Sequence, residues 1–207
     1  MSTLTEQFRL LKDFFKTDFR RFTIWCAVGL LLSMAIGFGI GLIYTDVIDT
    51  ALEFFLEKVE ESGVLQEDGN IALFALLANN WKAMLISAAY GFLPFVFLPV
   101  LSLVSNGLLI GVMGALYQSN GMSILVFLAG ILPHGIFELP ALILSIACGV
   151  YLCSNMGRLI LGNAKRLPTV PLLCDLLRVM LLLVAPMTVV ASVIEVYLTP
   201  VILAWFL

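Results

Sequence analysis

The apolar run from Ser123 to Met156 holds one histidine, His134, and one acidic residue, Glu138, and no other charge. Ionisable groups inside a bilayer are expensive, so they usually face the interior of a helical bundle or a wet cavity. The run is also too long for one straight span, since a crossing needs about 20 residues. It therefore predicts membrane-embedded helices that bury a polar pair.

The composition of the whole chain is that of an integral membrane protein. The sequence is 61% hydrophobic and 12% charged, with a mean hydropathy of +1.08. Soluble domains carry about 25% charged residues. This low charge and high hydropathy make the lipid bilayer the expected environment. The sequence contains no basic block that would suggest binding to nucleic acid.

The N-terminal segment, residues 1–22, is predicted to be a cytoplasmic amphipathic helix. From Leu4 to Phe22, leucine and phenylalanine recur at helical spacing, and the basic residues occupy the other side. Anchoring on the membrane surface is the simpler interpretation, and docking of a partner is the alternative.

Residues 23–207 are predicted to form one transmembrane domain, whose first span covers about Thr23 to Tyr44. That span has a small residue at every fourth position, which allows a second helix to approach closely. The positions are Gly29, Ser33, Gly37 and Gly41. Packing within the chain is the first interpretation, and a homodimer interface is the alternative.

Charge sets the predicted orientation. Residues 46–70 are acidic and predict an extracytoplasmic amphipathic helix ending near Gly63, with a solvated acidic face. Residues 157–171 contain Arg158, Lys165 and Arg166 and predict a cytoplasmic loop. About five crossings then place the N-terminus in the cytoplasm and the C-terminus outside, whereas six would place the C-terminus inside.

Proline, glycine and asparagine predict several helix ends. Pro133, Gly135 and Pro140 predict a break in the long run, and Asn106-Gly107 predicts a second break. Asn79 or Asn80 is expected to cap the start of a helix. A further interruption is expected around Pro94 and Pro99, and a kink at Pro186. The fold class is therefore an all-α polytopic bundle with broken or half helices and amphipathic surface helices.

His134 and Glu138 would share one face of a helix, because they are four residues apart. The pair could be a hydrogen-bonded unit that joins helices, with Asn106, Asn79 and Asn80 as further partners. It could instead be a proton or cation site, as in many secondary transporters. Lys82 and Glu195 are interpreted as interface residues outside this site. No metalloprotease or serine-hydrolase motif is present, so neither catalysis nor a cofactor is expected.

Two motifs carry a family resemblance. Asn106-Gly107 with Gly111, followed by Pro133-His134-Gly135-Ile136 and Glu138-Leu139-Pro140-Ala141, resembles the stage II sporulation protein M family. The likeness covers about Asn79 to Gly157 and agrees with five spans. It implies a polytopic scaffold that recruits peptidoglycan-degrading partners to the septal membrane in spore formers. Relatives in organisms without spores leave the cellular process open.

The expected function is therefore membrane scaffolding or recruitment. A homodimer and membrane or cell-wall-associated proteins are the expected partners. Transport of a small ion or solute through the His134 and Glu138 site is the alternative.

Overall fold

A computed structural model describes residues 3–65, 71–162 and 169–206. The described chain is helical and contains no β-strand, only an isolated bridge between Leu65 and Ile71. The predicted acidic residues Glu67 and Asp68 and the basic residues Lys165 and Arg166 lie outside the described residues.

The helices follow one another in a simple order. The first five are α1 (Leu4–Phe14), α2 (Phe19–Ile43), α3 (Thr45–Ser62), α4 (Leu73–Ala89) and α5 (Leu98–Ser119). The long α6 (Ile124–Ile160) is followed by α7 (Thr169–Val179), α8 (Ala185–Val193) and α9 (Thr199–Leu203). Two π-helical turns, Met180–Val184 and Ile194–Leu198, join these last three helices into one rod.

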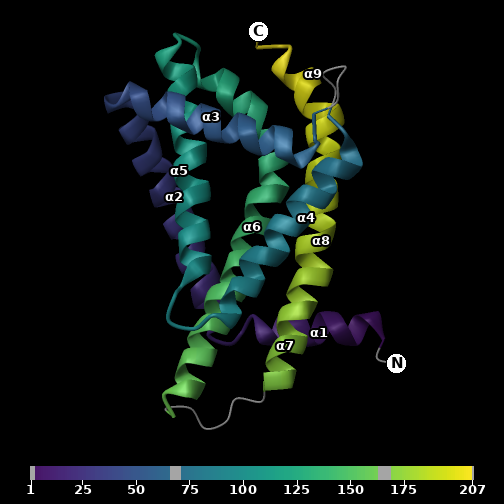
Figure 1. Ribbon diagram of the computed structural model, residues 1–207. Helices are drawn as coiled ribbons and strands as arrows, with labels where there is room; N and C mark the ends of the chain where they lie inside the picture. Colours follow the sequence, from purple (N-terminus) through teal and green to yellow (C-terminus); the bar gives the residue numbers. More distant parts are fainter. Residues whose placement is uncertain (1–2, 66–70, 163–168, 207) are drawn as a thin grey trace.

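The all-α membrane bundle predicted from the sequence is confirmed. Four segments of the described chain are long and apolar enough to cross a membrane: Phe19–Ile43, Leu98–Ser119, Ile124–Ile160 and Val170–Leu203. The prediction was about five, and α4, with 17 residues, is a shorter member of the bundle. In Figure 1, α1 and α3 lie across the bundle near its two ends, and the chain termini lie at opposite ends.

The helix breaks predicted at Pro133, Gly135, Pro140 and Gly107 are absent. Helix α6 continues through both prolines, and α5 continues through Asn106 and Gly107. A helix that ended inside the hydrocarbon region would leave many backbone groups without hydrogen bonds. A proline within a continuous helix leaves only the backbone groups of one turn without them. The interruption predicted around Pro94 and Pro99 is confirmed, because the chain breaks between α4 and α5, where Phe95 and Phe97 have positive φ angles.

Two predictions about helix starts also differ from the structure. Helix α4 begins at Leu73, so Asn79 and Asn80 lie inside it and cap nothing. The predicted helix from Leu4 to Phe22 is divided into α1 and the start of α2. Between these two helices, the rings of Phe14 and Phe19 stack with their centroids 4.6 Å apart, and both side chains are buried.

The small-residue stripe of α2 packs against α5. A Cβ atom added at Gly41 would lie 2.6 Å from the Cβ of Ala115, and one added at Gly107 would lie 2.5 Å from the Cβ of Ser33. The two backbones therefore approach as closely as glycine permits. Packing within the chain, the first interpretation of the stripe, is what the structure contains.

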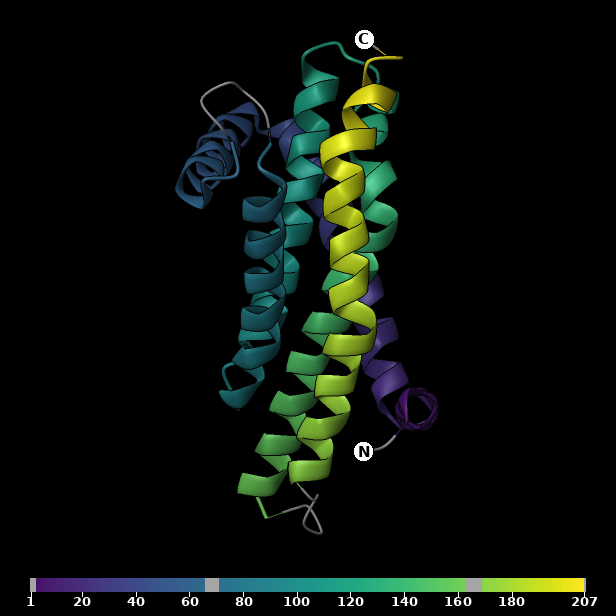
Figure 2. The ribbon, with the colours of Figure 1, turned by 90° about the vertical axis from the view of Figure 1, so that its right-hand side faces the viewer.

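Helix α6 is the centre of the bundle. It contacts α2, α4, α5 and the C-terminal rod, and its buried residues include Ala141, Ile146, Ala147 and Cys148. Figure 2 shows the C-terminal rod running alongside α6, and both helices extend past α1 at the N-terminal end of the bundle. Large apolar side chains cover much of the outside, as expected for a surface facing lipid.

Candidate functional site

His134 and Glu138 face each other on one side of α6. The Nε2 atom of His134 lies 3.8 Å from Oε2 of Glu138. The other ring nitrogen, Nδ1, lies 3.2 Å from the hydroxyl of Thr199, which belongs to α9. The histidine therefore connects α6 to the C-terminal rod.

Glu195 completes this group from the rod. Ligand atoms of His134, Glu138 and Glu195 all lie within 4.8 Å of one another. The interpretation of Glu195 as an interface residue missed this role. One signal was available, because Glu195 is the only charged residue between Val179 and Leu207.

The local structure that positions Glu195 follows from proline. Each π-helical turn of the rod ends shortly before a proline, Pro186 or Pro200. Proline has no N–H group, so the helix before it lacks one regular hydrogen bond and can widen by a residue. Glu195 lies in the second turn, and such π-turns are frequent at functional sites.

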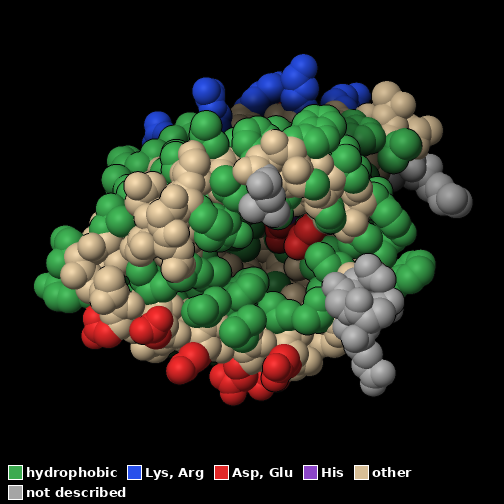
Figure 3. Space-filling view, turned by 90° about the horizontal axis from the view of Figure 1, so that it is seen from above, with side chains coloured by type: hydrophobic (Ala, Val, Ile, Leu, Met, Phe, Trp, Pro, Cys, Tyr) green, Lys and Arg blue, Asp and Glu red, His purple; other side chains and the backbone are tan. Residues whose placement is uncertain are grey.

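The site is half-buried. The His134 side chain is 13% exposed and the Glu138 side chain 28% exposed. Glu195 is also partly buried. In the view from the end that carries the C-terminus, acidic side chains lie within a hollow ringed by hydrophobic ones, apart from the acidic row along the edge (Figure 3).

The bundle closes on the α1 side of this site. Ile146, Ala147 and Cys148 of α6 are at most 1% exposed. The hydroxyl of Ser145 donates a hydrogen bond to the carbonyl of Met84 and so joins α6 to α4. The site is thus accessible from one end of the bundle and backed by close-packed helices.

The predicted asparagine partners lie elsewhere. Asn106 donates to the carbonyl of Ser102 in its own helix, at 2.8 Å. Asn79 is exposed on α4, and Nδ2 of Asn80 is buried with no hydrogen-bond partner in the described part of the chain. The prediction that these three asparagines lie beside His134 and Glu138 was therefore wrong, and Glu195 and Thr199 lie there.

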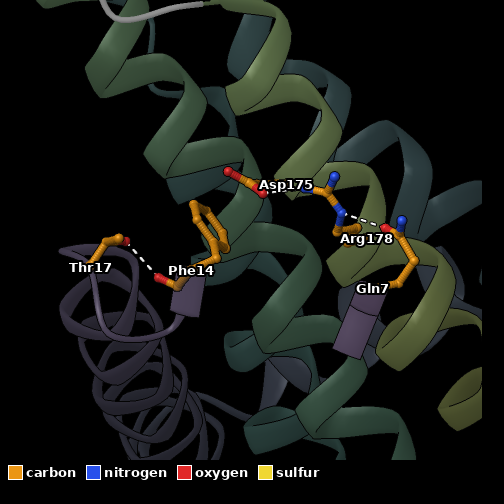
Figure 4. A network of polar contacts seen from close by, with 5 residues as sticks. All are labelled: Gln7, Phe14, Thr17, Asp175 and Arg178. Carbon is orange, nitrogen blue, oxygen red and sulfur yellow. Dashed lines mark hydrogen bonds and ion pairs between the residues drawn. The ribbon is translucent and has the colours of Figure 1, made fainter. Parts of the chain in front are cut away.

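A second polar network holds α1 to the rod (Figure 4). The guanidinium of Arg178 on α7 pairs with Asp175, as the spacing of three residues predicts, and its Nε donates to Oε1 of Gln7 at 2.6 Å. At the end of α1, the hydroxyl of Thr17 donates to the carbonyl of Phe14 at 2.6 Å. The bond between Arg178 and Gln7 links α1 to the rod, whereas the bond between Thr17 and Phe14 closes the end of α1.

Comparisons with known proteins agree with the motifs. The family model described as stage II sporulation protein M matches residues 23–200. An uncharacterized protein of the archaeon Methanocaldococcus jannaschii is 29% identical over 133 residues, which cover 64% of this chain and 74% of the relative. No solved structure matches. The chain belongs to the stage II sporulation protein M family.

Proposed function

We propose that this protein is a non-catalytic membrane scaffold that presents α3 to a protein partner. Helix α3 is the observation that carries the proposal. Among its residues only Ile48 is buried, where it packs with Val112 and Ala115 of α5. The rest of the helix lies across the end of the bundle (Figure 1).

The exposed part of α3 combines acidic and aromatic side chains. Acidic residues recur along it, at Asp46, Asp49, Glu53, Glu57, Glu60 and Glu61, against a single lysine, Lys58. Phe54 and Phe55 are exposed beside them. Aromatic side chains with complementary charges are typical of binding surfaces, so a basic segment of a membrane or cell-wall-associated protein fits this helix.

The orientation belongs to the same proposal. The basic residues near the N-terminus favour a cytoplasmic location for α1, and the acidic composition of α3 favours the outer side. The C-terminus lies at the same end of the bundle as α3 and would therefore be extracytoplasmic (Figure 1).

The experiment is site-specific photocrosslinking in living cells of the source organism. A photoreactive amino acid at Glu57 should give a discrete protein adduct, and the same group at Leu32, which is exposed on α2, should give none. Replacing Glu53, Glu57 and Glu60 together by glutamine should reduce an adduct formed from Leu56. Equal adducts from Glu57 and Leu32, or none from α3, would contradict the proposal.

A homodimer is also proposed, but it would use a different surface from the small-residue stripe. Ser33, Gly37 and Gly41 are buried against α5 and cannot face a second copy. Mass measurement of single particles in nanodiscs should give two chains per particle, and one chain at all concentrations would contradict the dimer.

A second candidate function is transport of a small ion. It is favoured by one observation, the group of His134, Glu138 and Glu195 inside the bundle. Reconstituted liposomes should then show pH- or ion-dependent flux that His134→Ala abolishes. Intact, folded protein without flux would leave the scaffold as the function.

A further inference from the structure

We propose that His134, Glu138 and Glu195 form a binding site for a divalent transition-metal cation, with Zn²⁺ and Mn²⁺ as the fitting ions. This site is independent of the partner surface on α3.

The donor atoms suit such an ion. Imidazole nitrogen and carboxylate oxygen bind Zn²⁺ and Mn²⁺, and three protein ligands leave a further position for water. Ligand atoms of one tetrahedral zinc ion lie about 3.4 Å apart, given metal–ligand distances of about 2.0–2.1 Å. The present separations, up to 4.8 Å, need a contraction of at most about 1.4 Å. Rotation about the glutamate side-chain bonds can provide it.

The histidine is oriented as in metal sites. A metal-binding histidine usually uses one ring nitrogen for the metal and holds the other by a hydrogen bond. Nδ1 of His134 is held by the hydroxyl of Thr199 at 3.2 Å, and Nε2 faces the carboxylate of Glu138. Thr199 therefore acts as a positioning residue for the nitrogen that would bind the cation.

The negative charge of the two carboxylates favours the binding of a cation. Among the described residues, the ion pairs give Glu138 no cationic partner except His134, and they give Glu195 none. Two ionised carboxylates this close together within an apolar bundle are costly unless a cation lies between them or one of them takes up a proton. A divalent ion would neutralise both at once.

A buried hydroxyl near the site supports a bound water or ion. Ser192 lies one turn before Glu195 and is 0% exposed, and its Oγ atom has no hydrogen-bond partner among the residues that the structure describes. Buried hydroxyl groups are normally satisfied, so we expect a bound water molecule at this atom, one helical turn from Glu195. The hollow above the site, visible in Figure 3, gives access from the C-terminal end of the bundle.

The consequence of binding would be a link between α6 and the C-terminal rod. His134 and Glu138 belong to α6, whereas Glu195 and Thr199 belong to the rod. An ion held by both would fasten two segments that are far apart in the sequence.

The test uses the purified full-length protein in detergent or nanodiscs, stripped with a chelator and titrated with Zn²⁺, Mn²⁺ or Co²⁺. Isothermal calorimetry and elemental analysis should give one ion per chain, and Co²⁺ should develop visible absorption typical of a nitrogen and oxygen site. Glu195→Gln should weaken binding at least tenfold. Thr199→Val should weaken it about tenfold, because outer-sphere partners of a metal ligand have effects of this size.

Glu57→Gln is the matched control, because it removes one carboxylate from the exposed face of α3 and should leave binding unchanged. Circular dichroism and gel filtration establish that each variant is folded. The proposal is overturned if the wild-type protein binds none of the three ions, or if binding survives both Glu195→Gln and His134→Asn. Loss of pH-dependent stability in Glu195→Gln without metal binding would identify a shared proton and would equally overturn the metal site.

Discussion

Gly37 and Gly39 differ sharply in their surroundings, although both lie on α2. A Cβ atom at Gly37 would collide with the backbone of Leu108 on α5, whereas one at Gly39 would meet nothing within 4 Å. We therefore expect Gly37→Ala to destabilise the protein by about 1–3 kcal/mol, the usual cost of overpacking. Gly39→Ala should be neutral or stabilising by up to about 1 kcal/mol, since alanine favours helix.

Thermal unfolding in detergent, followed by circular dichroism, compares the two variants directly. Equal midpoints for Gly37→Ala and Gly39→Ala would contradict the close approach of α2 and α5.

Lys58 and Glu61 form an exposed ion pair on α3 at 2.8 Å. The hydrogen bond from Lys58, and then its charge, lower the pKa of Glu61, and the same contacts raise the pKa of Lys58. The pair therefore stabilises α3 at neutral pH. Its contribution is lost as the pH falls through the lowered pKa of Glu61, or rises through the raised pKa of Lys58.

Carboxyl carbon NMR of selectively labelled glutamate in nanodiscs measures this effect. Glu61 should titrate below its ordinary range in the wild-type protein and return toward that range in Lys58→Gln. An unchanged titration of Glu61 in Lys58→Gln would mean that the pair does not form in solution.

Of the three residues of the site, the sequence indicated His134 and Glu138. His134 and Glu138 stand out because they are isolated in an apolar run and four residues apart. Their convergence with Glu195 depends on how the rod packs against α6 and on the π-helical turn that contains Glu195. Neither a regular helical period nor the spacing of charges specifies that register, so the third residue could not be placed from the sequence.

Among the elements, α1 is attached to the rod by the polar contacts of Arg178 and by the buried side chains of Leu11 and Phe14. Arg178 joins Asp175 and Gln7, and its side chain is 22% exposed. Hydrogen bonds to charged groups contribute about 1.5–3 kcal/mol. We expect Arg178→Ala to speed hydrogen exchange of the α1 amides by about tenfold or more, while α5 and α6 keep their protection.

Lys12→Ala is the comparison for this experiment, because Lys12 is an exposed cation on α1 itself. If α1 exchanges at the same rate in Arg178→Ala as in Lys12→Ala, the network of Figure 4 does not anchor the helix.

Helix type was predictable from the sequence, whereas helix continuity was not. The apolar runs around Gly37, Gly111 and Ala147 correctly indicated membrane helices, and Gly63 correctly marked the end of α3. Proline, however, does not end a helix in a bilayer as readily as it does in water. Pro133 and Pro140 remain inside α6 because no water is present to solvate the ends of a broken helix.

For the whole molecule, the native cysteines provide a test of orientation. Cys26, Cys148 and Cys153 are buried, and Cys174 on α7 is exposed. Helix α7 extends past α1 (Figures 1 and 2), so the proposed topology places Cys174 in the cytoplasm. A membrane-impermeant maleimide should label it only after the cells are permeabilised.

Cys174→Ser should abolish this labelling and serves as its control. Labelling of Cys174 from outside intact cells would reverse the topology and move α3 to the cytoplasmic side.

Glu195 meets His134 across the interface between α6 and the C-terminal rod. A double-mutant cycle of Glu195→Gln and His134→Asn, with unfolding free energies measured in one detergent, tests it most directly. We predict that the two changes are coupled by about 0.5–3 kcal/mol, as expected for residues in contact. If the unfolding free-energy changes of the two single variants sum to that of the double variant within about 0.3 kcal/mol, the two residues are not in contact and the site is contradicted.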